Sequence, residues 1–383
     1  MLPFDKTAKA YKKLKCPEGV YDPTTIPWKR NKYFVLCSER SIGKTTNILL
    51  YGMCMREIDG KTQLQYIRQH EDMLTPKNLN NLFATIEAYG YVEKVTNGKW
   101  KDLYYYSRGW YYCNKDENGK IVEKDTAPFM VCLGLNRNEY YKSSYNAPFG
   151  NFIIFDEFVS RYAISQDEFI MFCDVTKTII RGRSEPVIVM LGNTLDRYNM
   201  YFSEMELLGI STSMPLGEHT ETATAKGTPI YVEFPTGGKT HHKLEINRLF
   251  YGFKNKKLGA ITGDDWAIVP MQHIDSHDDE REILFKNIYV LYEGNVLQLE
   301  FAYSPSYGSH VLAHMAKAPH DDSRIYSADL MIDSRYRYKF GYDDIDKLIW
   351  TLYERKKFYY ASNTVGVLVD KYVDTCKQQR RLY

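Results

Sequence analysis

The sequence lacks the cysteine spacing of a disulfide framework or a zinc site. Its seven cysteines are an odd number, and no two of them form a C-x-x-C pair. We therefore expect buried thiols and a reducing compartment. No apolar run approaches the roughly 18 residues that a membrane-spanning helix needs, and the lysine-rich start has no apolar stretch long enough for a signal peptide. We expect a soluble, intracellular protein with no membrane partner.

The sequence also lacks an excess of charge of either sign. Its 50 Lys and Arg residues face 48 Asp and Glu residues, which leaves a formal net charge of +2. This balance excludes a polycation that wraps nucleic acid by bulk charge, so any nucleic-acid contact must be a local patch. Internal repeats and low-complexity tracts are absent as well. With 383 residues, 44% of them hydrophobic, the sequence predicts a folded protein of two or three domains.

Lysine and proline are frequent in the first 32 residues. The four prolines of this stretch exclude one continuous helix; they are Pro3, Pro17, Pro23 and Pro27. We expect residues 1–32 to form an irregular basic arm. It is either a solvated lead-in segment or a phosphate-binding arm.

Short apolar runs alternate with helical patterns between residues 33 and 212. Strands are predicted at 33–37, 64–68, 152–155 and 186–191, and helices at 45–57, 75–89 and 167–180. This alternation predicts an α/β domain with a mostly parallel sheet flanked by helices. Near residues 100–135, strand patterns on both sides of Asn118-Gly119, a strong turn signal, predict a hairpin insertion.

The composition changes after about residue 210. Residues 213–228 are rich in Gly, Thr and Glu without an apolar period, and we expect a linker there. Residues 229–383 are predicted to form a second, α+β domain. Its strands are expected at 230–234, 266–269, 288–292 and 296–301, and its helices at 342–353 and 365–377.

The segment from residue 38 to 46 matches the phosphate-binding loop pattern G-x-x-x-x-G-K-[ST], with Ser38 in place of the first Gly. A predicted strand precedes it and a predicted helix follows, a geometry in which backbone N–H groups bind phosphate. Lys44 would bridge the β- and γ-phosphates, and Thr45 would ligate Mg²⁺. The alternative is a chance Gly-Lys-Thr at a helix start. The predicted ATP-binding residues are Ser38, Glu39, Arg40, Ser41, Ile42, Gly43, Lys44, Thr45 and Thr46.

A second motif follows the apolar strand at 152–155, which ends in two acids, as in the Walker B pattern. Asp156 is predicted to hold the magnesium ion. Glu157 is predicted to orient and deprotonate the attacking water. The alternative for both acids is a structural role at a helix N-terminus, where the dipole favours negative charge.

Two further polar residues flank the strand at 186–191. Asn193 follows its end, at the edge of an α/β sheet where ligands gather, and is predicted to sense the γ-phosphate or the water. Arg181 precedes the strand, where it can reach a neighbouring subunit and stabilise the charge of the transition state. The alternative for Arg181 is a surface ion pair.

These motifs, in this order, resemble those of the DNA-encapsidation ATPases of small protein-primed podophages. The family comprises P-loop ring translocases of the additional-strand, catalytic-glutamate class, and the resemblance runs from about residue 33 to residue 202. It implies an ATP-driven motor that moves double-stranded DNA into a prohead. It also implies a C-terminal domain with a degenerate RNase H-like nuclease fold that binds nucleic acid or the prohead.

The resemblance also implies partners and residue roles. Lys142 and Arg181 would act in trans on the site of a neighbouring subunit, and Arg68 would contact the adenine. The chain would form a homo-oligomeric ring, expected to be a pentamer, in the host-cell cytoplasm and transiently at the portal vertex of the prohead. A packaging RNA is a further candidate partner.

The chemistry of the second domain and of the insertion is left open. Acid pairs in the second domain are read as solvated loop acids, so no nuclease activity is expected; the pairs are Asp264-Asp265, Asp278-Asp279 and Asp321-Asp322. Aromatic residues of the insertion either fill a core face or form a stacking surface for nucleic acid. The alternative functions are a helicase or remodelling ATPase, and a nucleotide-gated scaffold that does not hydrolyse ATP.

Overall fold

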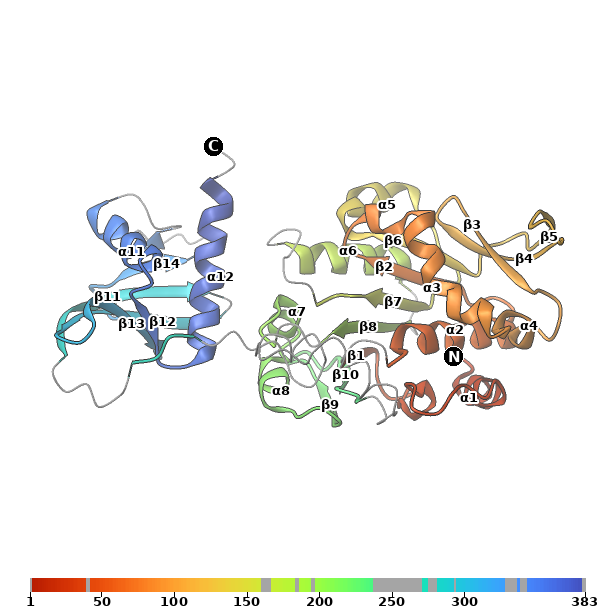
Figure 1. Cartoon of the computed structure of the whole chain (residues 1–383), viewed down its shortest axis with the longest axis horizontal. Coiled ribbons are helices and arrows are strands. Elements are labelled where there is room, and N and C mark those ends of the chain that lie inside the picture. The colour runs from red at the N-terminus through yellow and green to blue at the C-terminus, as the bar shows by residue number, and fades with distance from the viewer. Residues whose placement is uncertain are drawn as a thin grey trace. The chain divides into compact units, whose positions relative to one another are not determined.

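The chain divides into two compact units, residues 1–267 and 268–383, each described below by itself. The structure is a computed structural model (Figure 1). It describes residues 2–38, 42–159, 167–182, 186–193, 197–236, 271–274, 281–292, 294–327, 336–337 and 343–380.

The first unit is built on one large sheet that contains the predicted strands. Across the sheet the order is β3-β4-β6-β2-β7-β8-β1-β10-β9, with β5 paired to β4. These strands are β1 (Tyr33–Ser38), β2 (Leu64–Arg68), β3 (Asp102–Tyr106), β4 (Gly109–Lys115), β5 (Ile121–Lys124), β6 (Met130–Gly134), β7 (Phe152–Asp156), β8 (Val187–Asn193), β9 (His219–Ala223) and β10 (Pro229–Glu233). The strands from β6 to β10 in this order are parallel, so their carboxyl ends meet at one edge, where such sheets bind ligands.

Helices cover both faces of this sheet, which explains why its central strands are apolar throughout. One face carries α1 (Phe4–Lys13), α2 (Lys44–Asp59), α3 (Pro76–Ala88) and α4 (Tyr91–Val95), and the other carries α5 (Asn138–Ser144), α6 (Glu168–Ile180) and α7 (Met200–Glu204), followed by α8 (Leu208–Ser213). Single 3-10 turns lie at Pro23–Thr25, Glu71–Leu74 and Leu135–Arg137. Alternate residues of a strand enter opposite cores: Phe34 packs towards α2, and Val35 packs towards α6.

The irregular basic arm predicted for residues 1–32 is wrong. Part of it forms helix α1, and the rest packs against α2 and the sheet. The Trp28 ring stacks on Tyr51 of α2 at 5.1 Å and lies 4.7 Å from the Phe34 ring. Prolines bound this helix rather than break it, since Pro3 precedes it and Pro17 follows it. The segment is therefore part of the core, because its aromatic side chains pack against α2 and the sheet even though lysines are frequent in it.

The insertion contains one more hairpin than the sequence predicts. Asn118-Gly119 turns the chain between β4 and β5, as expected. A second turn at Ser107 and Arg108, both with positive φ, joins β3 to β4, and β6 then enters the main sheet beside β2. Tyr105 and Trp110 are packed in the core cluster, as the core-face alternative expects, whereas the Tyr106 side chain is exposed. The stacking surface for nucleic acid stays a prediction.

The linker predicted at 213–228 is also wrong. It contains edge strand β9, which pairs antiparallel with β10, and β10 lies parallel to β1 in the main sheet. Strand β9 is polar because its side chains are alternately exposed. One of them, Glu221, forms an ion pair with Arg30 and accepts a hydrogen bond from Asn31. Both strands thus belong to the first unit.

The second unit has a sheet in the order β15-β14-β11-β12-β13-β16. Its elements are β11 (Glu282–Tyr292), β12 (Asn295–Ser304), β13 (Gly308–Met315), β14 (Arg324–Ser327), β15 (Tyr336–Arg337), α11 (Asp344–Glu354), β16 (Phe358–Tyr360) and α12 (Asn363–Arg380). An antiparallel meander of β11, β12 and β13 is continued by parallel strands β14 and β15. This is the strand arrangement of an RNase H-like fold, as expected.

Several expectations for the second unit fall outside the described residues. They are the strand at 266–269 and the acids Asp264, Asp265, Asp278 and Asp279. Within the described ranges, no three His, Cys, Asp or Glu side chains are grouped as a metal site would require. The absence of nuclease activity stays a prediction. Among the described helices, none is both long and apolar enough to cross a membrane.

Candidate nucleotide-binding and hydrolysis site

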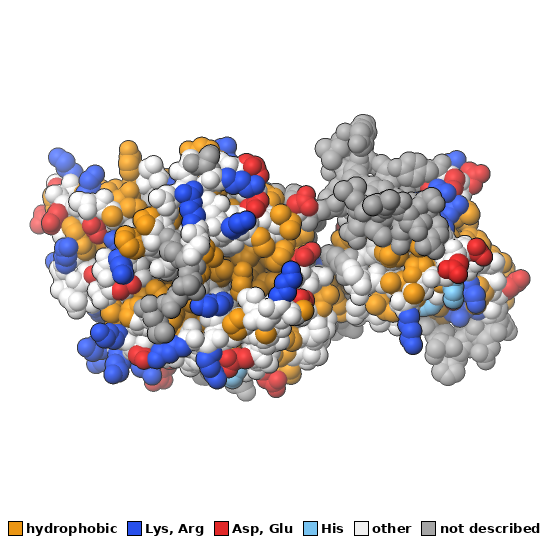
Figure 2. All heavy atoms as spheres, turned by 180° about the vertical axis from the view of Figure 1, so that it is seen from behind, with side chains coloured by type: hydrophobic (Ala, Val, Ile, Leu, Met, Phe, Trp, Pro, Cys, Tyr) orange, Lys and Arg blue, Asp and Glu red, His pale blue; other side chains and the backbone are white. Residues whose placement is uncertain are grey.

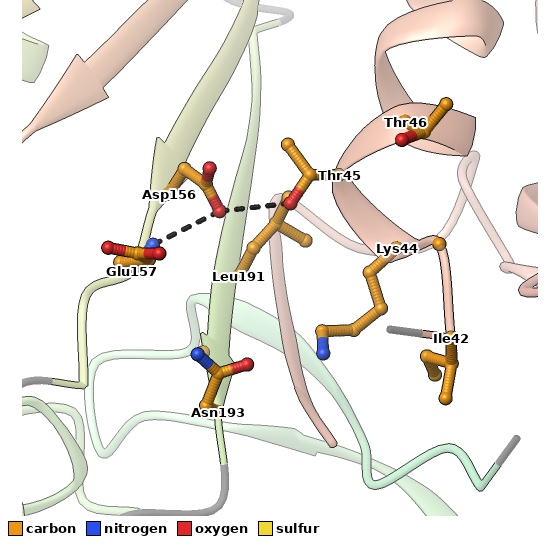
Figure 3. A pocket seen from close by; sticks show the side chains of 10 residues that line it. Ile42, Lys44, Thr45, Thr46, Asp156, Glu157, Leu191 and Asn193 are labelled. Carbon is orange, nitrogen blue, oxygen red and sulfur yellow. Dashed lines mark hydrogen bonds between the residues drawn. The ribbon is translucent and has the colours of Figure 1, made fainter. Parts of the chain in front are cut away.

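A pocket of about 360 Å³ lies at the carboxyl edge of the large sheet, between the start of α2 and the ends of β7 and β8. The predicted residues that line it are Ile42, Gly43, Lys44, Thr45, Thr46, Asp156, Glu157 and Asn193, joined by Leu191 and Gly192. Figure 3 shows Lys44 and Thr45 facing the two acids across the pocket. The structure thus brings together residues that lie more than a hundred positions apart. Glu39, Arg40 and Ser41 lie outside the described residues.

Gly43 gives the phosphate-binding loop its turn into α2. Its φ is +79°, in the left-handed region, and a Cβ atom there would lie 2.9 Å from Nδ2 of Asn47. Helix α2 begins at the next residue. The N–H groups of a first helical turn have no acceptor within their own helix. These groups and the positive end of the helix dipole both favour an anion at this position. This end of the pocket is therefore suited to phosphate.

Lys44 and Ser38 are buried together below the loop. The Lys44 ammonium donates a hydrogen bond to the Ser38 hydroxyl, which stands where the loop pattern has glycine. Ser38 therefore provides a hydrogen-bond acceptor for Lys44 at the position where the pattern has glycine. Burial lowers the pKa of Lys44 to about 8, and the neighbouring Cys37 and Asp156 oppose this shift. An ammonium group held so far from water gains from the arrival of negatively charged phosphate oxygens.

Asp156 ends β7 and is linked to the start of α2. Its Oδ1 accepts a hydrogen bond from Thr45 Oγ1 at 3.1 Å, and its Oδ2 accepts one from Tyr66 Oη at 2.6 Å. A hydroxyl and a carboxylate oxygen this close are hard donors of the kind that Mg²⁺ prefers. Thr45 and Asp156 therefore fit the ion predicted for this position.

Glu157 leaves the strand with a φ of +57°, which is unusual for a residue with a side chain. Its side chain is half exposed and lines the pocket. The backbone turn separates the directions of the two adjacent acids, since Asp156 is buried and bonded to Thr45. Glu157 therefore points away from the Thr45–Asp156 pair, and its carboxylate lies at the pocket, where it is paired with Arg68.

Arg68 does not occupy the position predicted for it. Its guanidinium bridges the two acids, with Nη1 3.0 Å from Asp156 Oδ2 and Nη2 2.8 Å from Glu157 Oε2. It does not line the pocket. Strand register explains this: β2 lies beside β7 with Ile67 opposite Phe155, so the next residues of the two strands meet. Arg68 balances the charge of the two acids in this structure, whereas the prediction had it contact the adenine of a nucleotide.

Tyr66 is a site residue that sequence reasoning missed. It is fully buried two positions before Arg68, and its hydroxyl donates to Asp156. Burial and then the charge of Asp156 raise the pKa of Tyr66 well above its ordinary value, so the hydroxyl stays a donor. The sequence signal that could have found Tyr66 is the two-residue period of a strand, which places residues 66 and 68 on the same face of β2.

We expect Arg68→Met to lower the free energy of unfolding by about 2–4 kcal/mol, because two adjacent carboxylates would lose their counter-charge in a largely buried place. Equilibrium unfolding in urea measures this. Arg30→Met is the control, since it removes the exposed ion pair with Glu221, which is worth about 1 kcal/mol or less. Equal effects of the two substitutions would contradict the assigned role of Arg68.

Asn193 ends β8 beside the phosphate-binding loop. It lies opposite Ser38 in the sheet and lines the pocket. The preceding Gly192 has no room for a side chain, since a Cβ atom would lie 2.8 Å from Val159 and 2.9 Å from Phe158. Tight packing at this position fixes the direction in which Asn193 leaves the strand.

Arg181 and Lys142 are not among the pocket residues. Arg181 follows α6 and precedes β8, so it lies at the amino end of that strand, whereas the pocket is at the carboxyl end. At about 3.3 Å per residue, the seven residues of β8 span about 20 Å from the amino end of the strand to its carboxyl end. Lys142 lies 2.6 Å from Glu139 and 3.1 Å from Asp174 of α6. Neither residue lines the pocket of its own chain.

The sequence matches no protein-family model, and no curated protein sequence matches it. Solved structures are similar to it over most of its length. A chain of the bacteriophage phi-29 viral genome packaging motor assembly is 16% identical; the match covers 92% of this chain and 98% of that one, with a TM-score of 0.58. The phi-28 gp11 DNA packaging motor is 16% identical, with 87% and 91% covered and a TM-score of 0.53. The chain therefore has the fold of these phage packaging motor proteins.

Proposed function

We propose that this chain is an ATP-driven motor that translocates double-stranded viral DNA into a prohead. One observation carries the proposal: Lys44, Thr45, Asp156 and Glu157 line a single pocket, in a chain with the fold of phage genome packaging motors. Magnesium, when bound, would neutralise part of the phosphate charge. Thr45 and Asp156 would hold it, and Lys44 would bind the phosphate oxygens.

Hydrolysis is assigned to Glu157. In the proposal its carboxylate orients a water molecule and takes up the proton as the water attacks the γ-phosphate. Asn193, at the end of β8, would bind the same water or the γ-phosphate. Arg68 competes for the Glu157 carboxylate, so the base works only when that ion pair is loosened.

The remaining positive charge comes from a neighbouring subunit in this proposal. Because Arg181 and Lys142 do not line the pocket of their own chain, a ring in which one subunit offers them to the next would complete each site. We propose a homo-oligomeric ring, with a pentamer as the expected size. It would work in the host cytoplasm at the portal of the prohead, with a packaging RNA as a further candidate partner.

The proposed DNA contact is local. On the face shown in Figure 2, Lys and Arg side chains of the larger unit are scattered among acids and do not form one broad band. This agrees with the near-neutral composition. A motor that moves along DNA needs contacts that can be released, which a modest number of phosphate contacts provides.

Steady-state ATP hydrolysis, measured with and without duplex DNA, tests the function. We expect turnover that depends on Mg²⁺ and rises with duplex DNA in an assembly whose mass is a multiple of the chain. Separation of a forked duplex would indicate a helicase instead. Tight ATP binding without turnover under every condition would indicate a scaffold.

A further inference from the structure

The excess positive charge of the chain is concentrated in its first 32 residues. They hold eight of the 50 Lys and Arg residues but only three of the 48 Asp and Glu residues, which gives this segment a formal charge of +5. Residues 33–383 carry a formal charge of −3, although the whole chain carries +2. Because a near-neutral chain can bind a polyanion only through a local patch, the N-terminal segment is the place to look for one.

Most of this charge lies on the outer face of α1. The buried residues of the helix recur at the three- and four-residue spacing of one helical face; they are Phe4, Thr7 and Tyr11. The lysines of the helix are exposed on the opposite face; they are Lys6, Lys9, Lys12 and Lys13. Lys6, Lys9 and Lys13 follow one another at the same spacing, so they form a line along the helix, here called the lysine stripe.

The lysine stripe has no counter-charge within the first unit. Among the described residues, none of the α1 lysines forms an ion pair, and the acid of the helix, Asp5, is paired with Lys29 at 2.5 Å. Ammonium groups three and four residues apart on a helix repel each other, and the helix dipole disfavours Lys6 in the first turn. The stability of α1 therefore does not explain these charges, whereas a bound polyanion does.

The inner face of α1 holds the helix in place beside α2 (Figure 1). The Tyr11 hydroxyl donates a hydrogen bond to Asn47 Oδ1 of α2 at 2.5 Å, and the Tyr51 hydroxyl of α2 donates one to the Phe4 carbonyl at 3.2 Å. Both tyrosines are buried. The lysines are thus mounted on a fixed helix, which presents their ammonium groups at a defined spacing.

The burial of this inner face distinguishes between two polyanionic partners. A basic amphipathic helix binds an anionic membrane by inserting its apolar side chains. In α1 those side chains are packed in the core, so the helix offers only its charges. The charges are all lysines, which act as point charges and suit the phosphates of a nucleic-acid backbone without reading base edges. These features favour a nucleic-acid backbone over a lipid surface.

The length of the stripe fits a few phosphates of a duplex. From Lys6 to Lys13 the helix rises by about 10 Å, at about 1.5 Å per residue. One strand of a DNA duplex carries a phosphate for about every 3.4 Å of axis, so the stripe matches about three phosphates of one strand. Three lysines and three phosphates are equal in number.

We propose that the lysine stripe of α1 binds the phosphate backbone of duplex DNA independently of its sequence. The inference rests on the proposed function, in which duplex DNA is the substrate, and it deepens that function by assigning a DNA contact to this face. A contact of about three phosphates is weakened by salt and can be released as the DNA moves.

Fluorescence anisotropy of a labelled duplex of about 30 base pairs, titrated with the full chain between about 50 and 200 mM salt, tests the proposal. The combined substitution Lys6→Gln, Lys9→Gln and Lys13→Gln should raise the Kd about 10- to 100-fold at about 0.1 M salt. It should also reduce the slope of log Kd against log salt by about 2.7, since three phosphate contacts are lost. Glutamine and lysine have similar helix propensities, so α1 should stay folded.

Two further variants separate the stripe from bulk charge and from folding. Glutamine at three exposed lysines on other segments, Lys61, Lys77 and Lys226, removes the same net charge and should leave the Kd within about twofold. Arginine at the three stripe positions keeps the charge and should leave the Kd within about threefold. Melting temperatures of all three variants report any loss of stability.

Equal losses of affinity in the two glutamine variants would overturn the proposal, because the loss would then follow net charge. An unchanged salt slope in the stripe variant would overturn it as well. Tighter binding of duplex RNA of the same sequence, lost in the stripe variant, would assign the stripe to RNA and overturn the assignment to DNA. In each case the proposed function stands if the unaltered chain binds duplex DNA and hydrolyses ATP. If it does neither, the proposed function itself fails.

Discussion

Glu157→Gln is expected to reduce steady-state ATP turnover by about 10²–10⁴-fold, while the Kd for ATP stays within about threefold. The amide cannot accept the proton of the attacking water, but it has nearly the same shape and can still accept a hydrogen bond from Arg68. Phosphate binding depends on the loop and on Lys44, which the substitution does not touch. The measurement pairs phosphate release at saturating ATP with equilibrium titration of nucleotide.

The control for this substitution is Glu93→Gln, which removes an exposed carboxylate paired with Lys101. It should leave both turnover and affinity unchanged. Retained turnover in Glu157→Gln would mean that another group activates the water. A large loss of affinity would mean that Glu157 acts in binding. Either result would remove Glu157 from the role of base.

Arg181→Ala is expected to lower turnover in the assembled ring by about 10³–10⁵-fold, the effect of an arginine that stabilises the transition state from a neighbouring subunit. Nucleotide affinity should change little, because Arg181 precedes β8 and does not line the pocket of its own chain, which lies at the carboxyl end of that strand. Lys177→Ala, one turn earlier on α6 and exposed, is the matched control.

Mixing experiments distinguish action in trans from action in cis. A subunit with Glu157→Gln still offers Arg181, and a subunit with Arg181→Ala still offers Glu157. If the residues meet across an interface, a mixture of the two inactive variants contains some complete sites and regains turnover. If the mixture shows only the average of two low activities, the assignment of Arg181 to a neighbouring site is wrong.

Sequence reasoning singled out the residues of the loop pattern and the two acids because each pattern is local. Lys44 and Thr45 follow a buried strand within a few residues, and Asp156 and Glu157 end another. Each motif carries its own flanking pattern, so no knowledge of the strand order is needed. The pocket confirms that these residues converge.

The misassigned residues are those whose position depends on pairing over long distances. Arg68 meets the acids because β2 lies beside β7 in one particular register. Strand β9 falls within the predicted linker because an edge strand that is exposed on one face has little apolar character, whereas β10 was predicted as a strand. The N-terminal segment was predicted to be an irregular basic arm because of its lysines and prolines. Its fold depends instead on the contacts of Tyr11 and Trp28 with α2.

Strand β9 closes one margin of the large sheet in a way that bears on how copies of the chain associate. Glu221, on this outermost strand, is tied to Arg30 and Asn31 of the same chain. A charged residue on a short outer strand discourages another polypeptide from extending the sheet by backbone pairing. Among the described strands, β9 thus forms a margin that disfavours association of copies by backbone pairing.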